Sequence, residues 1–121
     1  MTSVFEAVGG KAIGYVSGGA VTQATNKSTA VTLNTQGGQI TMNNAALADG
    51  AEVTFQVNND KVAATDVIGV NIASGGTAGA YLVVVSAVAA GSFKITVSNV
   101  SGGALSQAIV LNYAVTKSAA S

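Results

Sequence analysis

The sequence has 121 residues, enough for one ordinary domain, and 49% of them are hydrophobic, which suffices for a core without metals or cross-links. Only 8% are charged, five Lys balance five acidic residues, and Arg, His and Cys are absent. These absences argue against disulfides, thiolate or imidazole metal sites and recognition of phosphates or bases. We therefore expect no cofactor, no metal and no nucleic-acid partner.

The sequence also predicts no membrane segment. The longest apolar run covers residues 80–90 and is interrupted by Ser86. It is well short of the roughly 20 residues that a membrane-spanning helix needs. Residues 1–8 lack a basic region followed by an apolar run, so we do not expect a secretory signal there.

Strands are predicted by alternation between apolar and polar side chains. The 15 Gly, the absence of Pro and the many Val and Thr residues favour strands joined by glycine turns. In residues 52–58, for example, Val53, Phe55 and Val57 share one face. In chain order, this period of two predicts strands at residues 30–34, 39–43, 52–58, 67–72, 81–85, 93–97 and 109–115. The spacing predicts an all-β fold, a β-sandwich or jelly roll of about eight antiparallel strands.

The connections between these strands carry turn residues. Residues 37–38 (Gly-Gly) predict a tight turn, residues 44–50 a single helical turn and residues 58–61 a polar loop tip. The glycine-rich residues 74–79 are interpreted as a flexible hairpin loop, since neither a Gly-Lys-Ser/Thr sequence nor a helix follows them. Within the strand at 67–72, Gly69 favours the close approach of a neighbour.

The chain divides into an N-terminal arm, residues 1–18, and a single β-sandwich domain, residues 19–121. Residues 17–20 (Ser-Gly-Gly-Ala) mark the boundary. The arm carries four large apolar side chains with little periodicity, namely Phe5, Val8, Ile13 and Tyr15. We expect it to dock on a neighbouring copy or on a support surface.

The strand at residues 81–85 is apolar on both faces. Tyr81, Val83 and Val85 share one face, and Leu82 and Val84 share the other. A strand in a two-layer sandwich turns only one face to its own core, so the second face needs a cover. The arm, a loop or a second copy of the chain could supply it, and we favour a symmetric homo-oligomer because exposure would forgo about 1.5–3 kcal/mol for each large side chain.

No group of residues predicts catalysis. Asp49 and Glu52 are the only acidic residues close in sequence, and an Asp beside a Gly is ordinary turn chemistry. A Ser-Lys pair brought together by the fold stays open, but no local motif supports it. We expect a protein that is not an enzyme.

Several short sequence segments of the chain resemble those of a family of small structural proteins from tailed bacteriophage particles. They cover residues 19–116 and are, in order, 21–29 (VTQATNKST), 31–34 (VTLN), 38–43 (GQITMN), 53–55 (VTF), 73–81 (ASGGTAGAY) and 89–93 (AAGSF). The resemblance implies a β-sandwich or jelly-roll domain that attaches to the capsid surface, often as a trimer. It supplies no catalytic residues.

The resulting hypothesis is a capsid decoration, or cement, protein located in the virion. Its partners would be the major capsid protein and further copies of itself, with a trimer favoured, and Phe5, Val8, Ile13, Tyr15, Leu82 and Val84 would form the oligomer or capsid interface. The alternative is a tail-fibre or head-fibre adhesion module that binds host glycans. A hydrolase with an unrecognised Ser-Lys or carboxylate site is the third possibility.

Overall fold

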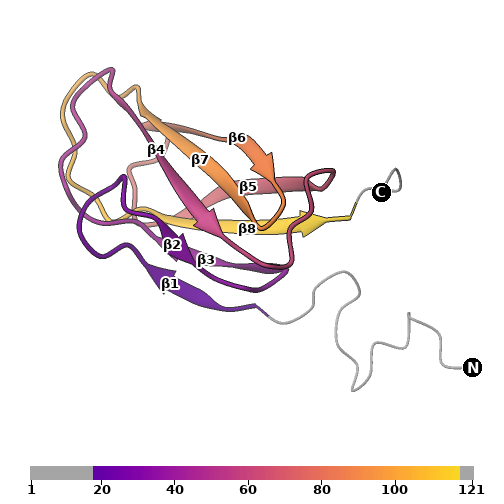
Figure 1. Ribbon diagram of the computed structural model, residues 1–121. Coiled ribbons are helices and arrows are strands. Elements are labelled where there is room, and N and C mark those ends of the chain that lie inside the picture. Colours follow the sequence, from indigo (N-terminus) through magenta and orange to yellow (C-terminus); the bar gives the residue numbers. More distant parts are fainter. Residues whose placement is uncertain (1–17, 118–121) are drawn as a thin grey trace, which may run out of the picture.

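Alternating side chains produce eight strands in the computed structural model, which describes residues 18–117 (Figure 1). Within these residues, no helix is both long and apolar enough to cross a membrane. The strands are β1 (Ala20–Thr22), β2 (Val31–Thr32), β3 (Gly37–Thr41), β4 (Glu52–Asn58), β5 (Val67–Ser74), β6 (Tyr81–Ala89), β7 (Ser92–Asn99) and β8 (Val110–Thr116).

The strands form two four-stranded sheets that pack face to face, as Figure 1 shows. Sheet A has the order β1-β3-β8-β5, and sheet B has the order β2-β4-β7-β6. The chain changes sheet after almost every strand, and β6 and β7 are the only consecutive strands in residues 18–117 that pair with each other. The all-β sandwich of about eight strands that the sequence predicts is therefore confirmed.

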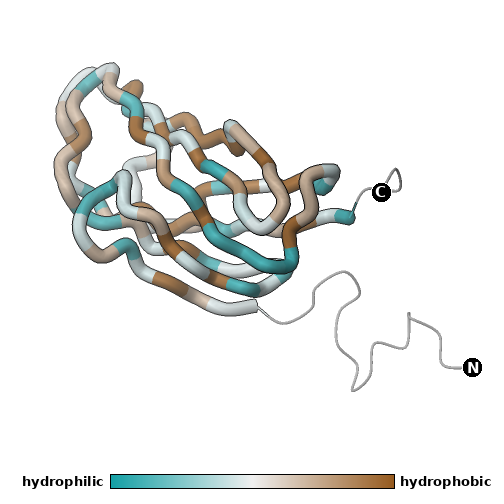
Figure 2. Tube along the Cα trace, viewed as in Figure 1, coloured by the Kyte–Doolittle hydropathy of each residue, from teal (hydrophilic) through white to brown (hydrophobic). Residues whose placement is uncertain are grey.

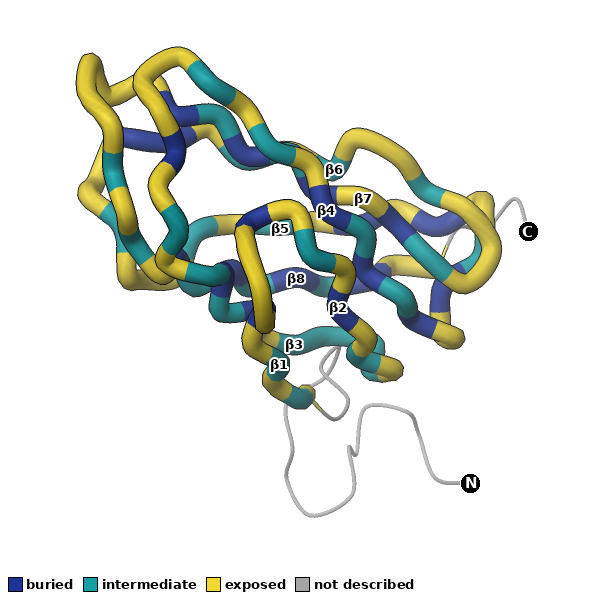
Figure 3. The backbone as a smooth tube through the Cα atoms, turned by 60° about the vertical axis from the view of Figure 1, so that its left-hand side comes forward, coloured by how far each residue is buried: buried dark blue, intermediate teal, exposed yellow. Residues whose placement is uncertain are grey.

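The core consists of the side chains that both sheets turn inward, and Figure 3 marks the buried residues along the backbone of both sheets. Figure 2 shows the corresponding alternation of hydrophobic and hydrophilic residues along the strands. Sheet A contributes Ile40, Leu111, Tyr113 and Val115, and sheet B contributes Phe55, Val57, Phe93, Ile95 and Val97. The rings of Phe93 and Tyr113 meet across the sheets with centroids 5.4 Å apart and planes tilted by 58°, an arrangement that aromatic pairs favour.

The strands are not all antiparallel, which corrects the prediction in one respect. β1 pairs with β3 in parallel, and β2 pairs with β4 in parallel. Parallel neighbours need a crossover connection between them. Here the chain makes that crossover through a strand of the opposite sheet, β2 between β1 and β3, and β3 between β2 and β4.

Three predicted connections also differ from the structure. Residues 37–38 do not form a tight turn; they begin β3, which lies in the other sheet from β2. Residues 44–50 contain no helical turn, because Leu47 is buried and forms a bridge with Leu105. Residues 74–79 do not form a hairpin, because β5 and β6 belong to different sheets.

The connection from β5 to β6 is held by Gln107, on the segment before β8. Its side-chain oxygen accepts hydrogen bonds from the Thr77 backbone N–H at 3.1 Å and the Tyr81 hydroxyl at 2.8 Å. Its side-chain nitrogen donates to Thr77 Oγ1 at 2.9 Å. These bonds fix the start of β6, and so they decide which side chains of that strand turn outward.

A glycine at the beginning of this connection is required by both its backbone and its surroundings. Gly75 has a φ of 81°, and a Cβ added there would lie 2.3 Å from the Ala108 carbonyl oxygen. Gly79 has nearly the same φ, 80°, but a Cβ there would meet nothing within 4 Å. The two positions thus separate the cost of the left-handed backbone from the cost of a steric clash.

We predict that Gly75→Ala destabilises the protein more than Gly79→Ala. Both substitutions place a Cβ on a left-handed backbone, at about 1–2 kcal/mol. Only Gly75→Ala forces the backbone away from Ala108, so its loss in the free energy of unfolding should be larger by at least about 1 kcal/mol. Urea denaturation of both variants measures the difference, and equal losses would show that this contact does not fix the connection.

Candidate interaction surface

The outer face of β6 exposes the two apolar side chains that the sequence analysis singled out. Leu82 is 60% exposed and Val84 is 54% exposed, whereas Tyr81 is 6% exposed and faces the core. No loop within residues 18–117 covers them. A loop from residues 18–117 therefore does not cover this face. The N-terminal arm and a second copy of the chain remain as possible covers.

β6 is also an edge strand of sheet B, with β7 on one side only. An edge strand offers unpaired backbone N–H and C=O groups to another chain. β6 carries no charged side chain from Tyr81 to Ala89, so charge does not protect it against such pairing. A bulge interrupts the strand where the register with β7 shifts between Val85 and Ala87, and residues 81–85 before it stay regular.

Hydroxyl groups lie beside the apolar pair on the same sheet face. Val84 is in register with Thr96 on β7, which is in register with Thr54 on β4. The hydroxyls of Thr54 and Thr96 are 2.7 Å apart, and Thr96 Oγ1 donates to Ser86 Oγ at 2.9 Å. These side chains satisfy one another, so they do not require water or a partner to complete their hydrogen bonds.

The other predicted interface residues, Phe5, Val8, Ile13 and Tyr15, lie outside the described residues. The structure therefore gives Leu82 and Val84 a location and leaves the four arm residues as predictions. The described part begins at Gly18, two residues before β1.

The outer face of sheet A carries a groove that the sequence analysis missed. It has a volume of about 940 Å³ and crosses β3, β8 and β5 beside Gly18 and Gly19. Its lining contains five glycines and no charged residue, and the glycines are Gly18, Gly19, Gly37, Gly38 and Gly69. A sequence signal existed in Gly69, which breaks an otherwise apolar strand pattern.

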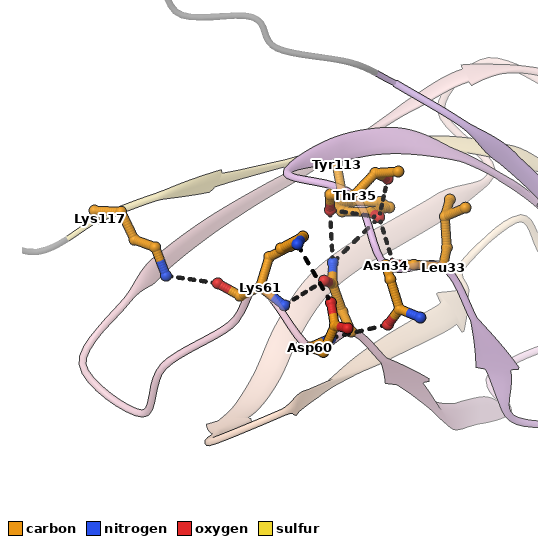
Figure 4. Close-up of polar contacts among 8 residues, drawn as sticks. Leu33, Asn34, Thr35, Asp60, Lys61, Tyr113 and Lys117 are labelled. Atoms are coloured by element: carbon orange, nitrogen blue, oxygen red, sulfur yellow. Dashed lines mark hydrogen bonds and ion pairs between the residues drawn. The ribbon is translucent and has the colours of Figure 1, made fainter.

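A polar cluster lies at the end of the sandwich near Lys117 (Figure 4). Asn59 is 1% exposed, and its side-chain nitrogen donates to the Thr35 carbonyl at 2.7 Å and the Tyr113 hydroxyl at 3.3 Å. The sequence of residues 58–61 predicts a polar loop tip. That interpretation is wrong for Asn59, which ties this loop to the residues that precede β3.

Lys27 is a second buried polar group that the sequence analysis did not identify. It is 3% exposed, and its ammonium donates to the backbone carbonyls of Asn43 and Gln107, the latter at 2.7 Å. Among residues 18–117, no carboxylate forms an ion pair with it. Burial lowers its pKa from the ordinary value because the charged form loses hydration.

The acidic side chains at Asp49 and Asp66 make structural contacts. The Asp49 carboxylate accepts a hydrogen bond from the Gly102 backbone N–H at 3.0 Å, which is a turn contact. Asp66 forms an ion pair with Lys117 at 2.7 Å and accepts from the Ala63 N–H at 2.8 Å. Within residues 18–117, no three Asp or Glu side chains gather where they could hold a metal ion.

Three comparisons with known proteins found no match: no protein-family model, no curated protein and no solved structure matches the chain.

The Tyr113 hydroxyl supplies a pH-dependent test of the polar cluster. It lies 3.0 Å from Thr35 Oγ1, and burial raises its pKa above the ordinary value of 10.0, partly offset by hydrogen bonds from Thr35 and Asn59. Because the folded pKa is raised, the unfolded chain loses this proton first. The stabilisation is complete below about pH 10 and is lost as pH rises through the folded pKa.

We predict that Tyr113→Phe lowers the free energy of unfolding by about 1 kcal/mol near neutral pH, because its hydrogen-bond partners lose one contact. The difference from the wild type should shrink above about pH 10. Tyr81, whose pKa burial also raises, and Lys27 are common to both proteins, so they cancel in this difference. Urea unfolding of both proteins across this pH range measures the difference in their free energies of unfolding. A difference that stays constant would contradict the raised pKa of the Tyr113 hydroxyl.

Proposed function

We propose that this protein is a decoration protein of a tailed-phage particle, which binds the outer capsid surface and strengthens the shell. The observation that carries the proposal is the uncharged edge strand β6, with Leu82 and Val84 exposed on its outer face. The resemblance of the short sequence segments quoted above supports the connection to phage particles. The major capsid protein and other copies of the chain are the proposed partners, and a trimer is favoured by the resemblance alone.

The proposed mechanism is passive and additive. Burial of each large apolar side chain at an interface is worth about 1.5–3 kcal/mol. Such a contact is weak alone, but several linked contacts raise the total affinity without any new kind of interaction. An oligomer that engages adjacent capsid subunits would therefore hold them together more firmly than a single copy does.

The adhesion alternative receives less support from the structure. Glycan sites commonly use exposed aromatic rings beside polar groups. All four aromatic residues in the described part of the chain, Phe55, Tyr81, Phe93 and Tyr113, are buried. A glycan would have to be bound without them.

We predict that the isolated protein is larger than a monomer at micromolar concentration, and that replacing both Leu82 and Val84 with Ser converts it to a monomer. The physical reason is the loss of apolar area at the interface. Val67→Ser is the matched control, since Val67 is 63% exposed but lies on the outer face of sheet A. Light scattering measures the mass. If the wild type is a monomer, or if Val67→Ser lowers the mass as much as the double variant does, β6 is not the self-association surface.

For the capsid role, we predict that purified particles carry hundreds of copies of the chain, as a shell component with one copy per local site requires. The double Leu82/Val84→Ser variant should bind depleted particles less well than Val67→Ser, and those particles should release DNA at a lower temperature. Quantitative mass spectrometry gives the copy number. A handful of copies per particle would favour a fibre, and none would refute a virion role.

A further inference from the structure

The backbone of β6 alternates between its neighbour β7 and the open edge of sheet B. Val100 donates its backbone N–H to the Ala80 carbonyl at 2.8 Å, in the register of the β6–β7 pair. In an antiparallel pair, only every second residue exchanges hydrogen bonds with the neighbouring strand. Leu82 and Val84 therefore bond to β7, and the N–H and C=O groups of the odd-numbered residues point to the open edge.

The hydrogen bonds on the other side of β7 have the same phase. Asn99 donates its backbone N–H to the Ala51 carbonyl at 2.9 Å, in line with β4, whereas the next residue, Val100, bonds toward β6. Within residues 18–117, no strand lies beyond β6 in sheet B. The outward backbone groups of the odd-numbered residues in 81–85 are therefore open to a further strand.

The regular part of β6 is symmetric about Val83. The strand begins at Tyr81, and the bulge after Val85 ends its regular pairing. The residues in between read Tyr-Leu-Val-Val-Val, and none of them is small or charged. A second copy of this stretch, running antiparallel, overlaps it completely only when the two Val83 residues lie opposite each other.

That register suits both the backbone and the side chains. The odd-numbered residues form the hydrogen-bonded pairs, because their N–H and C=O groups already point to the edge. Leu82 then lies opposite Val84 of the second copy in a pair without hydrogen bonds, where facing Cβ atoms are about 4.5–5.5 Å apart. The two exposed apolar side chains of each copy thus cover those of the other.

Two further features favour a second copy over a strand of a different protein. A two-fold contact brings each residue near its own symmetry mate, so a charge there would repel itself. β6 carries no charge from Tyr81 to Ala89. On the core side, Val83 is only half-buried, although its partner Val97 on β7 has 0% exposure. The core is therefore incompletely closed along this edge, and Val83 of a second copy extends it.

We propose that two copies of the chain join through antiparallel β6 strands centred on Val83, so that their two B sheets form one continuous sheet. The inference rests on the self-association in the proposed function and gives that contact its geometry. The assembly unit is then a two-fold dimer. A trimer would need a contact outside β6.

Cysteine substitutions test this register in a chain that has no Cys of its own. We expect Leu82→Cys mixed with Val84→Cys to form a disulfide-linked dimer at least about tenfold faster under mild oxidation than either variant alone. Only the mixture places the two cysteines directly opposite each other. In either variant alone they lie on the diagonal of the sheet, about 7–8 Å apart, which is too far for a disulfide.

Val67→Cys mixed with Leu82→Cys is the matched control. Val67 is 63% exposed, close to the 60% of Leu82, but it belongs to sheet A. This mixture reports on random collisions, so it should cross-link no faster than the single variants. Light scattering of the unmodified protein gives the second readout, and we expect the mass of a dimer.

Two results would overturn the proposal, and both leave the capsid role to its own test of copy number on particles. Equal cross-linking in the mixture and in the single variants, from a protein that still self-associates, would mean that β6 meets its copy in another register or by its face. A monomeric wild type without cross-links would mean that the arm or a strand of another protein covers the edge. Fast cross-linking only in the Leu82→Cys and Val84→Cys mixture, with a dimer mass, supports the proposal.

Discussion

The structure depends on one constraint, namely that each sheet has a single apolar face and can bury it only against the other sheet. Ile40, Leu111 and Val115 of sheet A therefore face Phe55, Ile95 and Val97 of sheet B, all with little or no exposure. A one-residue slip in any strand would move its apolar side chains to the outside. The same constraint that fixes the core also fixes which residues are left on the two outer faces, and the exposed side chains of β6 carry the proposed function.

The period-two pattern was sufficient to find the strands that contribute most to this core. Residues 52–58, 93–97 and 109–115 alternate clearly, and each lies within or largely overlaps a strand of the structure. β1 has three residues and was not predicted, because so short a strand leaves no period to detect. The pairing of strands could not be predicted from the sequence either. Alternation says which face a residue takes but not which strand lies beside it, so the parallel pairs and the position of residues 37–38 at the start of β3 came only from the structure.

Buried polar groups were the second kind of feature that sequence reasoning could not find. Asn and Gln are usually surface or turn residues, so Asn59 in a run of polar residues carried no signal of burial. Its role follows from long-range contacts, with Thr35 and Tyr113. Gln23 is similar: it is 2% exposed, and its side chain bonds the carbonyls of Lys27 and Thr29 and the N–H of Asn43.

These buried groups explain how so much irregular chain can be held against a small core. Gln23 and Lys27 close the connection between β1 and β2 against residue 43, and Lys27 also reaches Gln107. Gln107 in turn holds the connection that leads into β6. A buried ammonium that bonds only backbone carbonyls is costly to desolvate, yet here it fastens segments 80 residues apart in sequence. The polar groups thus support the surface at β6 indirectly, through the loops that orient it.

The two outer faces differ in where their charged and exposed apolar side chains lie. Sheet B carries Glu52 and Lys94 on its outer face, and its apolar residues Leu82 and Val84 lie at the edge. The bulge after Val85 interrupts the edge beyond that point, so residues 81–85 are the part of β6 that remains regular enough to meet another chain. The groove on sheet A has no charged lining, and Gly37, Gly69 and Ala114 are among the residues that line it. An edge with exposed apolar side chains suits contact between proteins. An uncharged, apolar edge that stays uncovered promotes unspecific association, and this physical cost is the reason to expect a partner at Leu82 and Val84.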